Sequence, residues 1–414
     1  MRCLKIFLWA LSFILNLSIF NNIQGENKKK QTVPSPKKIV DSLCISTSGD
    51  IFNSDHTELA ESIGIDVDWT IYQIHRSASE NPTDLNNKIK LMHDKGKLYV
   101  HYLMPSVWMP DGHFSSYPEL LNYAAIDIDG NRVKTQAGDH FTRYPMDILE
   151  PGWQQFIKKE LKTVIDAGAD GIFIDEIQNQ IISILPPLAG VFNQPDMQGF
   201  NEFLSKTYPV SVLNSKFGIP DLSTFNYKDY IISKEYKNLW KVEPWKVPLY
   251  GEYNIYEYKA TLEFFEYIIK WAKDYALSSY GKSIVFLGNT SNGLDISLPY
   301  EKSLDLSFLE FPYLKMGYPP LCKVIPASKV RPDNRWKKGT YQTQVPTNTD
   351  LQKRGNPANI AKLFLVEAYA SQCEYQVPID VPAIIGGYSP NLDILSKHFN
   401  FFKIYESLFS RGNP

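Results

Sequence analysis

The chain has 414 residues, 43% of them hydrophobic, and a formal net charge of −2. This length suits one elaborated domain or two small ones. The near-neutral charge lacks the basic excess that favours binding to nucleic acid or to an anionic membrane surface.

The N-terminal 38 residues differ from the rest of the chain. Arg2 and Lys5 flank the start of an apolar run over residues 6–20, which is short for a membrane span and typical of a signal peptide. We therefore predict a signal peptide over residues 1–25 and a polar linker over residues 26–38. The protein is then expected to be secreted, periplasmic or on the cell surface, and an uncleaved anchor is the alternative.

From residue 39 to residue 414, short β-rich runs alternate with amphipathic helical patterns, as in a parallel sheet built from βα units. The predicted strands are residues 39–47, 65–75, 97–104, 170–177, 283–289, 304–311, 341–345 and 373–377. The predicted helices are residues 84–95, 153–167, 256–279, 359–370 and 392–408. Eight strands in this order predict an α/β fold of the (β/α)8 TIM-barrel type, in which the seventh strand has the weakest pattern.

Residues 178–250 interrupt this alternation. The segment is rich in Pro, Tyr, Phe and Trp, and it is too long for an ordinary barrel loop. We predict a partly helical insertion after the fourth strand, over the mouth of the barrel.

Metal and cofactor motifs are weak. Cys44, Cys322 and Cys373 permit one disulfide at most and match no zinc spacing. Residues 127–131 are similar to a calcium loop, although such a stretch is more often a hairpin turn. No phosphate loop, metalloprotease motif or serine elbow has a convincing context. We expect neither a metal ion nor a cofactor.

The acidic pair Asp175 and Glu176 follows the apolar run Ile172-Phe173-Ile174 of the fourth predicted strand. In a barrel of this type, catalytic groups stand at the carboxyl-terminal ends of the strands. Adjacent strand residues point to opposite sides, so only one of the two acids can aim straight into the pocket. The alternation by itself leaves open which one.

The segment Gly-Ala-Asp-Gly-Ile-Phe-Ile-Asp-Glu (residues 168–176) resembles the fourth-strand signature of glycoside hydrolases of the alpha-galactosidase, dextranase and polygalactosaminidase group. The stretch over residues 147–153 is similar to the lead-in of those barrels. The resemblance implies that Asp175 is the catalytic nucleophile of an enzyme that cleaves O-glycosidic bonds in a poly- or oligosaccharide. A retaining mechanism with two carboxyl groups would follow.

A second carboxyl group is needed to protonate the leaving oxygen. Glu310 ends the sixth predicted strand beside aromatic and apolar residues, which favour a protonated carboxyl group. The resembling enzymes also carry their acid on the sixth strand, but as Asp. Glu176 is the alternative acid.

Side chains near other strand ends are candidates for sugar binding. The high aromatic content, 14%, suits this role because aromatic faces stack on the apolar C–H faces of sugar rings. The candidates are Tyr102, His101, Trp108, Asp147, Asn289 and Tyr313.

The expected partner is a carbohydrate, with no nucleic acid and no stable membrane insertion beyond the signal. The protein is expected to be a monomer. Two alternatives stay open: a carbohydrate-binding barrel without catalysis, and a polysaccharide lyase, whose unsaturated product absorbs in the ultraviolet.

Overall fold

The structure is a computed structural model that describes residues 35–36, 46–48, 67–69, 77–110, 112, 114–137, 141–175, 191–289, 303–311, 339–343, 373–378, 397, 401 and 404. The predicted signal peptide, the predicted helix over residues 359–370, Glu176 and Tyr313 lie outside these residues. No helix in the described part of the chain is long and apolar enough to cross a membrane.

Eight parallel strands pair in a closed barrel, in the order β1, β2, β3, β7, β8, β9, β10, β11 and back to β1. Their bounds are β1 Ser46–Ser48, β2 Val67–Trp69, β3 Leu98–Leu103, β7 Gly171–Ile174, β8 Val285–Asn289, β9 Leu306–Phe311, β10 Gly339–Thr343 and β11 Cys373–Pro378. Each predicted strand overlaps one of them, and the predicted α/β class is confirmed. The described helices follow β2, β3 and β7.

Successive residues of a strand contact two different cores. Leu98 and Tyr102 of β3 join Phe173 of β7 in a cluster inside the barrel. Tyr99 of β3 and Ile172 of β7 instead join the larger cluster between the strands and the outer helices. This alternation decides which strand residues face the barrel interior.

α4 (Pro82–Asp94) and α5 (Pro151–Asp166), two of the helices on the outside of the barrel, begin earlier than predicted. α4 packs against β3, and it starts at a proline after Asn81, whose side chain accepts a hydrogen bond from the backbone N–H of Asp84. α5 also starts at a proline. It ends before Gly168, whose φ of 96° is a conformation that glycine adopts without strain.

The loop between β3 and α5 contains a 3₁₀ helix, η4 (Pro118–Tyr123), and a small antiparallel sheet of β4 (Val107–Trp108), β6 (Phe141–Pro145) and β5 (Thr135–Ala137). Residues 127–131, the stretch similar to a calcium loop, form a hairpin turn. Asp127 Oδ1 accepts hydrogen bonds from the backbone N–H groups of Asp129 and Asn131, at 2.9 and 2.8 Å. Asp127 Oδ1 therefore stabilises the turn through hydrogen bonds to its backbone.

The segment between β7 and β8 contains a group of helices that we call the head, defined as residues 191–249 with the first turns of α11. An aromatic core of its own, which includes Phe200, Tyr227 and Trp240, holds the head together. The helices are α7 (Gln194–Thr207), α8 (Val210–Val212), the π-helix η6 (Leu213–Phe217), α9 (Tyr227–Ser233), α10 (Lys237–Val242), the 3₁₀ helix η7 (Pro244–Lys246) and α11 (Tyr250–Tyr280).

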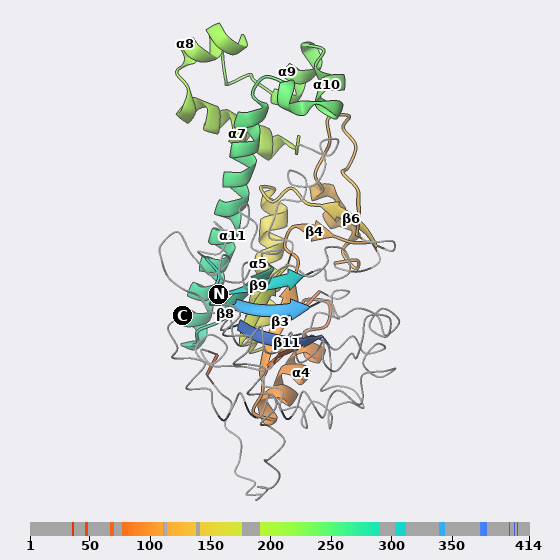
Figure 1. Cartoon of the computed structure of the whole chain (residues 1–414), viewed down its shortest axis with the longest axis vertical. Coiled ribbons are helices and arrows are strands. Elements are labelled where there is room, and N and C mark those ends of the chain that lie inside the picture. The colour runs from red at the N-terminus through yellow and green to blue at the C-terminus, as the bar shows by residue number, and fades with distance from the viewer. Residues whose placement is uncertain are drawn as a thin grey trace, which may run out of the picture.

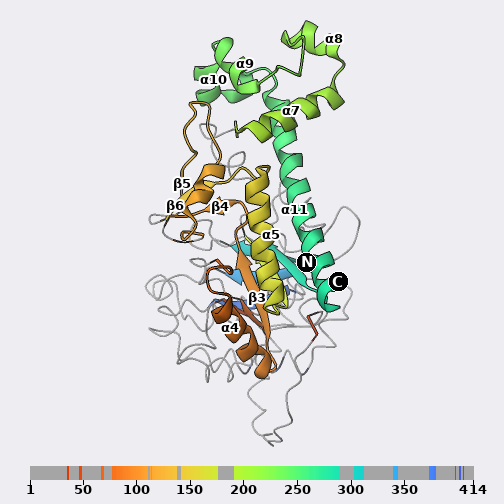
Figure 2. The ribbon, with the colours of Figure 1, turned by 180° about the vertical axis from the view of Figure 1, so that it is seen from behind.

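The head lies at the far end of α11 from the barrel strands (Figures 1 and 2). α11 has 31 residues, and α5 packs beside it. It begins six residues before its predicted start, at Tyr250, because its first turns are part of the head core. The prediction that this segment covers the barrel mouth is wrong for its described part, since the long α11 holds the head off to one side.

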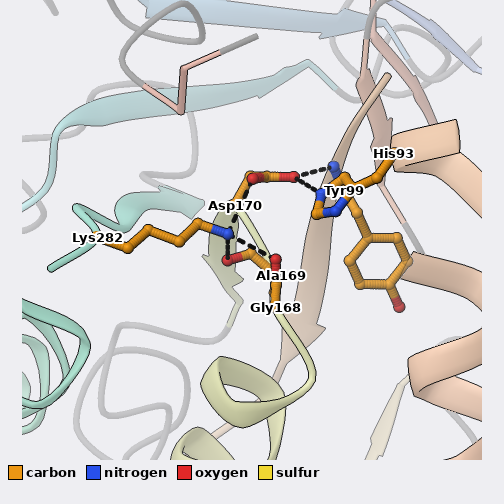
Figure 3. A network of polar contacts seen from close by, with 6 residues as sticks. All are labelled: His93, Tyr99, Gly168, Ala169, Asp170 and Lys282. Carbon is orange, nitrogen blue, oxygen red and sulfur yellow. Dashed lines mark hydrogen bonds and ion pairs between the residues drawn. The ribbon is translucent and has the colours of Figure 1, made fainter. Parts of the chain in front are cut away.

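A buried carboxylate anchors the start of β7 (Figure 3). Asp170 is 1% exposed, and its Oδ2 accepts a hydrogen bond from the Tyr99 N–H at 2.9 Å and lies 2.8 Å from His93 Nε2. Its Oδ1 lies 3.1 Å from Lys282 Nζ, which also donates to the carbonyl oxygens of the two residues before Asp170. The network joins α4, β3 and β7 at the amino-terminal face of the barrel, where side chains generally serve stability.

Candidate active site

Asp175 is the first residue after β7, at the carboxyl-terminal end of the barrel. Its backbone N–H donates to the carbonyl oxygen of Leu103 at 3.0 Å, so pairing with β3 continues one residue past the strand. Phe173 packs inside the barrel against Tyr102, with ring centroids 5.5 Å apart. Because side chains alternate along a strand, Asp175 lies on the interior side with Phe173.

Two neutral side chains hold the carboxylate of Asp175. The hydroxyl of Tyr102 donates to Oδ2 at 2.5 Å, and the amide Nδ2 of Asn289 donates to Oδ1 at 2.9 Å. Tyr102 is 5% exposed and Asn289 is 7% exposed, whereas Asp175 is partly exposed. Hydrogen bonds to a charged acceptor are short and directional, so each carboxylate oxygen has a set direction.

Three different strands build this arrangement. Tyr102 comes near the end of β3, Asp175 follows β7, and Asn289 ends β8. These strands are neighbours in the barrel, so their ends meet although the residues are far apart in sequence. An oriented, accessible carboxylate at this edge can act as a nucleophile or can stabilise a developing positive charge.

Glu310 lies in β9, one residue before its end, and pairs in register with Gln342 of β10. All eight strands are parallel, so Glu310 and Asp175 belong to the same end of the barrel, as the hypothesis of two cooperating carboxyl groups requires. The alternative acid Glu176 and the rim residue Tyr313 lie outside the described residues.

The prediction that His101 binds substrate is wrong. His101 is 4% exposed and lies on the outer side of β3, where its Nδ1 is 3.4 Å from the hydroxyl of Tyr99. Burial, with a smaller effect from the charge of Lys88 on α4, lowers its pKa to about 4. The neighbour of an interior residue on a strand faces the helices, so His101 is a neutral core group.

The prediction that Trp108 stacks on a sugar also fails. Trp108 is 5% exposed, and its indole N–H donates to the carbonyl oxygen of Phe114 at 2.9 Å. Its ring packs edge-on against Tyr144 in the core beneath the helices. Its position in β4 of the small sheet turns the ring inward, so it serves packing.

Asp147 does not line the mouth of the barrel. It is 1% exposed, and its Oδ1 accepts a hydrogen bond from the backbone N–H of Leu149 at 2.9 Å. Burial, reinforced by the nearby acids Glu257 and Glu150, raises its pKa to about 8. The loop that leads into α5 turns this side chain toward the head.

Two further buried acids, Asp196 of α7 and Glu257 of α11, escaped the sequence interpretation. The burial of Glu257 could have been predicted from the sequence, because its spacing places it on the same helix face as the apolar residues Tyr253, Ala260 and Phe264. In the described residues, no group of three His, Cys, Asp or Glu side chains is arranged to hold a metal ion.

No protein-family model and no curated protein sequence matches the chain. Among solved structures, it is similar to an alpha-galactosidase from Lactobacillus brevis, with 11% identity and a TM-score of 0.46 over 91% of this chain and 42% of that one. It is also similar to a sulfoquinovosidase of family GH31 from E. rectale, with 14% identity and a TM-score of 0.47 over 92% of this chain and 50% of that one.

A third similar structure is Ega3 of Aspergillus fumigatus, solved in complex with galactosamine. The identity is 11% and the TM-score 0.39, over 86% of this chain and 96% of that one. The chain thus spans less than half of the alpha-galactosidase. These neighbours are glycoside hydrolases of the kind that residues 168–176 resemble. With TM-scores below 0.5 they carry no argument about activity, which rests on the geometry around Asp175.

Proposed function

We propose that the protein is a glycoside hydrolase that cleaves O-glycosidic bonds of a poly- or oligosaccharide at the carboxyl-terminal end of its barrel. The observation that carries this proposal is the partly exposed carboxylate of Asp175, held through both oxygens by Tyr102 and Asn289. A carboxylate held in this way can meet the positive charge that develops at the anomeric carbon in the transition state.

In the proposed retaining mechanism, Asp175 attacks the anomeric carbon as the leaving oxygen accepts a proton from a second carboxyl group. The resulting glycosyl-enzyme ester is then hydrolysed by a water molecule, which the second group deprotonates. Tyr102 and Asn289 keep the carboxylate oriented through both steps.

Glu310 is the proposed second carboxyl group. Ile174 pairs with Gly288, so residue 175 lies level with Asn289, and Asn289 pairs with Phe308. In an eight-stranded barrel with a shear of about 8, each strand is shifted along the barrel axis by about one residue relative to its neighbour. From β7 to β9 the shift is about two residues, so the position of β9 at the height of Asp175 is about residue 310. Glu310 also has the same alternation phase as Leu306, which is buried in the barrel interior. This backbone register supports Glu310 as the partner of Asp175.

We further propose that the chain completes a (β/α)8 barrel, with residues 178–250 as an insertion after its fourth strand. Glu176 and Tyr313 would then belong to the same edge of the barrel as Asp175. The order of the eight strands supports this arrangement.

Export is also part of the proposal, through a signal peptide over residues 1–25 and a linker over residues 26–38. The support is the basic start and apolar run of the N-terminus. N-terminal sequencing of the protein recovered from producing cells tests it, and a mature protein that begins at Met1 contradicts cleavage.

Light scattering tests the expected monomer.

The deciding experiment is to incubate the purified protein with a panel of polysaccharides and to measure released reducing ends, in parallel with binding. Hydrolysis by the wild type, and binding without hydrolysis by Asp175→Asn, support the proposal. Binding without hydrolysis by the wild type as well would indicate a barrel that only binds carbohydrate. A product that absorbs in the ultraviolet would indicate a lyase.

The role of Glu310 has its own test. Glu310→Gln should lose most activity on a natural glycoside but keep much more on an aryl glycoside, whose leaving group departs without a proton. Equal losses on both substrates would remove Glu310 from the role of acid.

A further inference from the structure

Three carboxyl side chains from separate elements are buried together where the head meets the loop between β3 and α5. Asp147 of that loop, Asp196 of α7 and Glu257 of α11 are 1%, 2% and 3% exposed. Tyr256 donates to Asp196 Oδ1 at 3.0 Å, and a side-chain hydrogen bond joins Asp196 to Glu257. We call these three acids the carboxyl cluster.

The surroundings of the carboxyl cluster favour its uncharged form. Each acid sits beside the others, and their mutual repulsion opposes ionisation. The described groups that act most strongly on it are acids and phenols: Asp147 and Glu150 from the loop, Asp196 from α7, and Tyr253, Tyr256 and Glu257 from α11.

The hydrogen bonding requires protons within the cluster. Two carboxylates are both acceptors, so the bond between Asp196 and Glu257 needs a proton on one of them. Asp147 Oδ2 is buried and accepts no hydrogen bond, which leaves a bare carboxylate there unsatisfied. Protons on these acids remove the charge that burial opposes.

The other polar contacts between head and loop do not change protonation near neutral pH. Asn193 of the head accepts from the Ile126 N–H at 2.8 Å and donates to the Ala124 carbonyl oxygen at 3.1 Å. Asp129 pairs with two lysines of the head, Lys237 and Lys241, whose hydrogen bonds lower its pKa. Asp129 therefore stays ionised through the neutral range, and the carboxyl cluster is the part of this contact that titrates there.

We propose that the carboxyl cluster is a proton-operated lock, which holds the head against the loop between β3 and α5 while protonated and releases it when its protons are lost. The cluster spans three elements, so ionisation forces apart the loop, α7 and α11 at one point. The other buried contacts between head and loop, among them Ile128 in the head core and Val191 against Ala125 and Val133, do not titrate, so the pH dependence of this contact resides in the carboxyl cluster.

The direction of the pH effect follows from the raised pKa of Asp147, about 8, against an ordinary value of 3.8. An acid whose pKa is raised in the folded state stabilises that state fully below its ordinary pKa. The contribution falls as pH rises and is lost once pH passes the folded-state pKa. The lock is therefore tightest in acid and is open at alkaline pH.

Hydrogen exchange of the full-length protein, followed by mass spectrometry from about pH 5 to about pH 9 and corrected for intrinsic exchange rates, tests the lock. Peptides from α7 and from residues 141–150 should lose protection as pH rises, by up to about tenfold per pH unit for each bound proton. Peptides from α5, which the lock does not hold, should keep their protection and serve as the internal control.

The matched variants are Glu257→Gln, whose amide cannot ionise, and Glu263→Gln, which changes an exposed acid of the same helix. Glu257→Gln should flatten the pH dependence of head protection, and Glu263→Gln should leave it as in the wild type. If Glu257→Gln does not fold, the wild-type series still decides.

Three results would overturn the lock. One is equal head protection across the pH range in the wild type. Another is an unchanged slope in Glu257→Gln. The third is protection that calcium restores at alkaline pH and a chelator removes in acid, which would make the cluster a cation site.

Discussion

Asp170 and Asp175 flank the same short strand, β7, and the protein surrounds them in opposite ways. Asp170 is 1% exposed, and its charge meets the ammonium of Lys282 at 3.1 Å and the imidazole of His93 at 2.8 Å. Asp175 is partly exposed, and a phenol and an amide hold it. Among the described residues, Asp170 is matched with the ammonium of Lys282 and with His93, and Asp175 is oriented by a phenol and an amide.

The difference shows how one strand supports both stability and chemistry. At the amino-terminal end, a buried charge is stable only when it is paired and fully hydrogen-bonded. At the carboxyl-terminal end, a phenol and an amide fix the direction of a carboxylate that stays partly exposed, so that it can meet a positive centre. Substitutions of Asp170 should therefore change mainly the free energy of unfolding, and substitutions of Asp175 mainly the activity.

The largest expected effect is that of Asp175→Asn on activity. The amide keeps the size of the side chain but can neither attack nor stabilise an anomeric centre, so the rate should fall by about 10³-fold or more. Initial rates on the best substrate of the panel measure this, and the thermal unfolding midpoint should stay near that of the wild type. A variant that keeps a tenth of the activity would contradict the catalytic role.

Asp170→Asn should act on stability instead. Removing the carboxylate leaves the ammonium of Lys282 facing backbone carbonyls without its counter-charge, at a cost of about 3 kcal/mol in the free energy of unfolding. Urea unfolding measures it. The control is Asp94→Asn, which breaks an exposed pair with Lys90 and should cost at most about 1 kcal/mol. Equal effects would deny the anchoring role of Asp170.

Tyr102→Phe tests the orientation of Asp175 at constant ring packing. A hydrogen bond to a charged group contributes about 1.5–3 kcal/mol, so kcat/KM should fall roughly 10- to 100-fold with little change in stability. The matched control is Tyr99→Phe, on the outer face of the same strand, which should leave kcat/KM nearly unchanged. A similar loss in both variants would point to strand packing rather than to the carboxylate.

The smallest expected effect is that of Gly168→Ala, next to the Asp170 network. Its φ of 96° disfavours any side chain, so the substitution should lower the free energy of unfolding by roughly 1–2 kcal/mol and leave kcat/KM unchanged. Gly251→Ala in α11 is the control, because a Cβ there meets no other atom within 4 Å. The control should be neutral or slightly stabilising.

The positions of the strands and the residues that surround Asp175 could be predicted from local sequence patterns. The run Ile172-Phe173-Ile174 at the end of a parallel strand pointed to the acidic pair of residues 175 and 176, and the resemblance of residues 168–176 to a known signature selected Asp175. Tyr102 and Asn289 were expected near it because they also lie near strand ends. His101 shows the limit of this argument. Strand alternation divides the residues between two faces, but it does not tell which face lies toward the barrel interior. Only the packing of Phe173 and Tyr102 identified it.

The sequence alone determined the features that depend on neighbours in the chain, namely the α/β class, the eight strand segments and an aspartate at the end of the fourth strand. Tertiary structure decided which distant side chains meet. In the tertiary structure Trp108 and Asp147 are buried, and the head lies at the far end of α11 from the barrel strands. Asp196 and Glu257 lie beside Asp147. Burial and the mutual repulsion of charges depend on contacts between remote segments, and a linear pattern carries no record of those contacts.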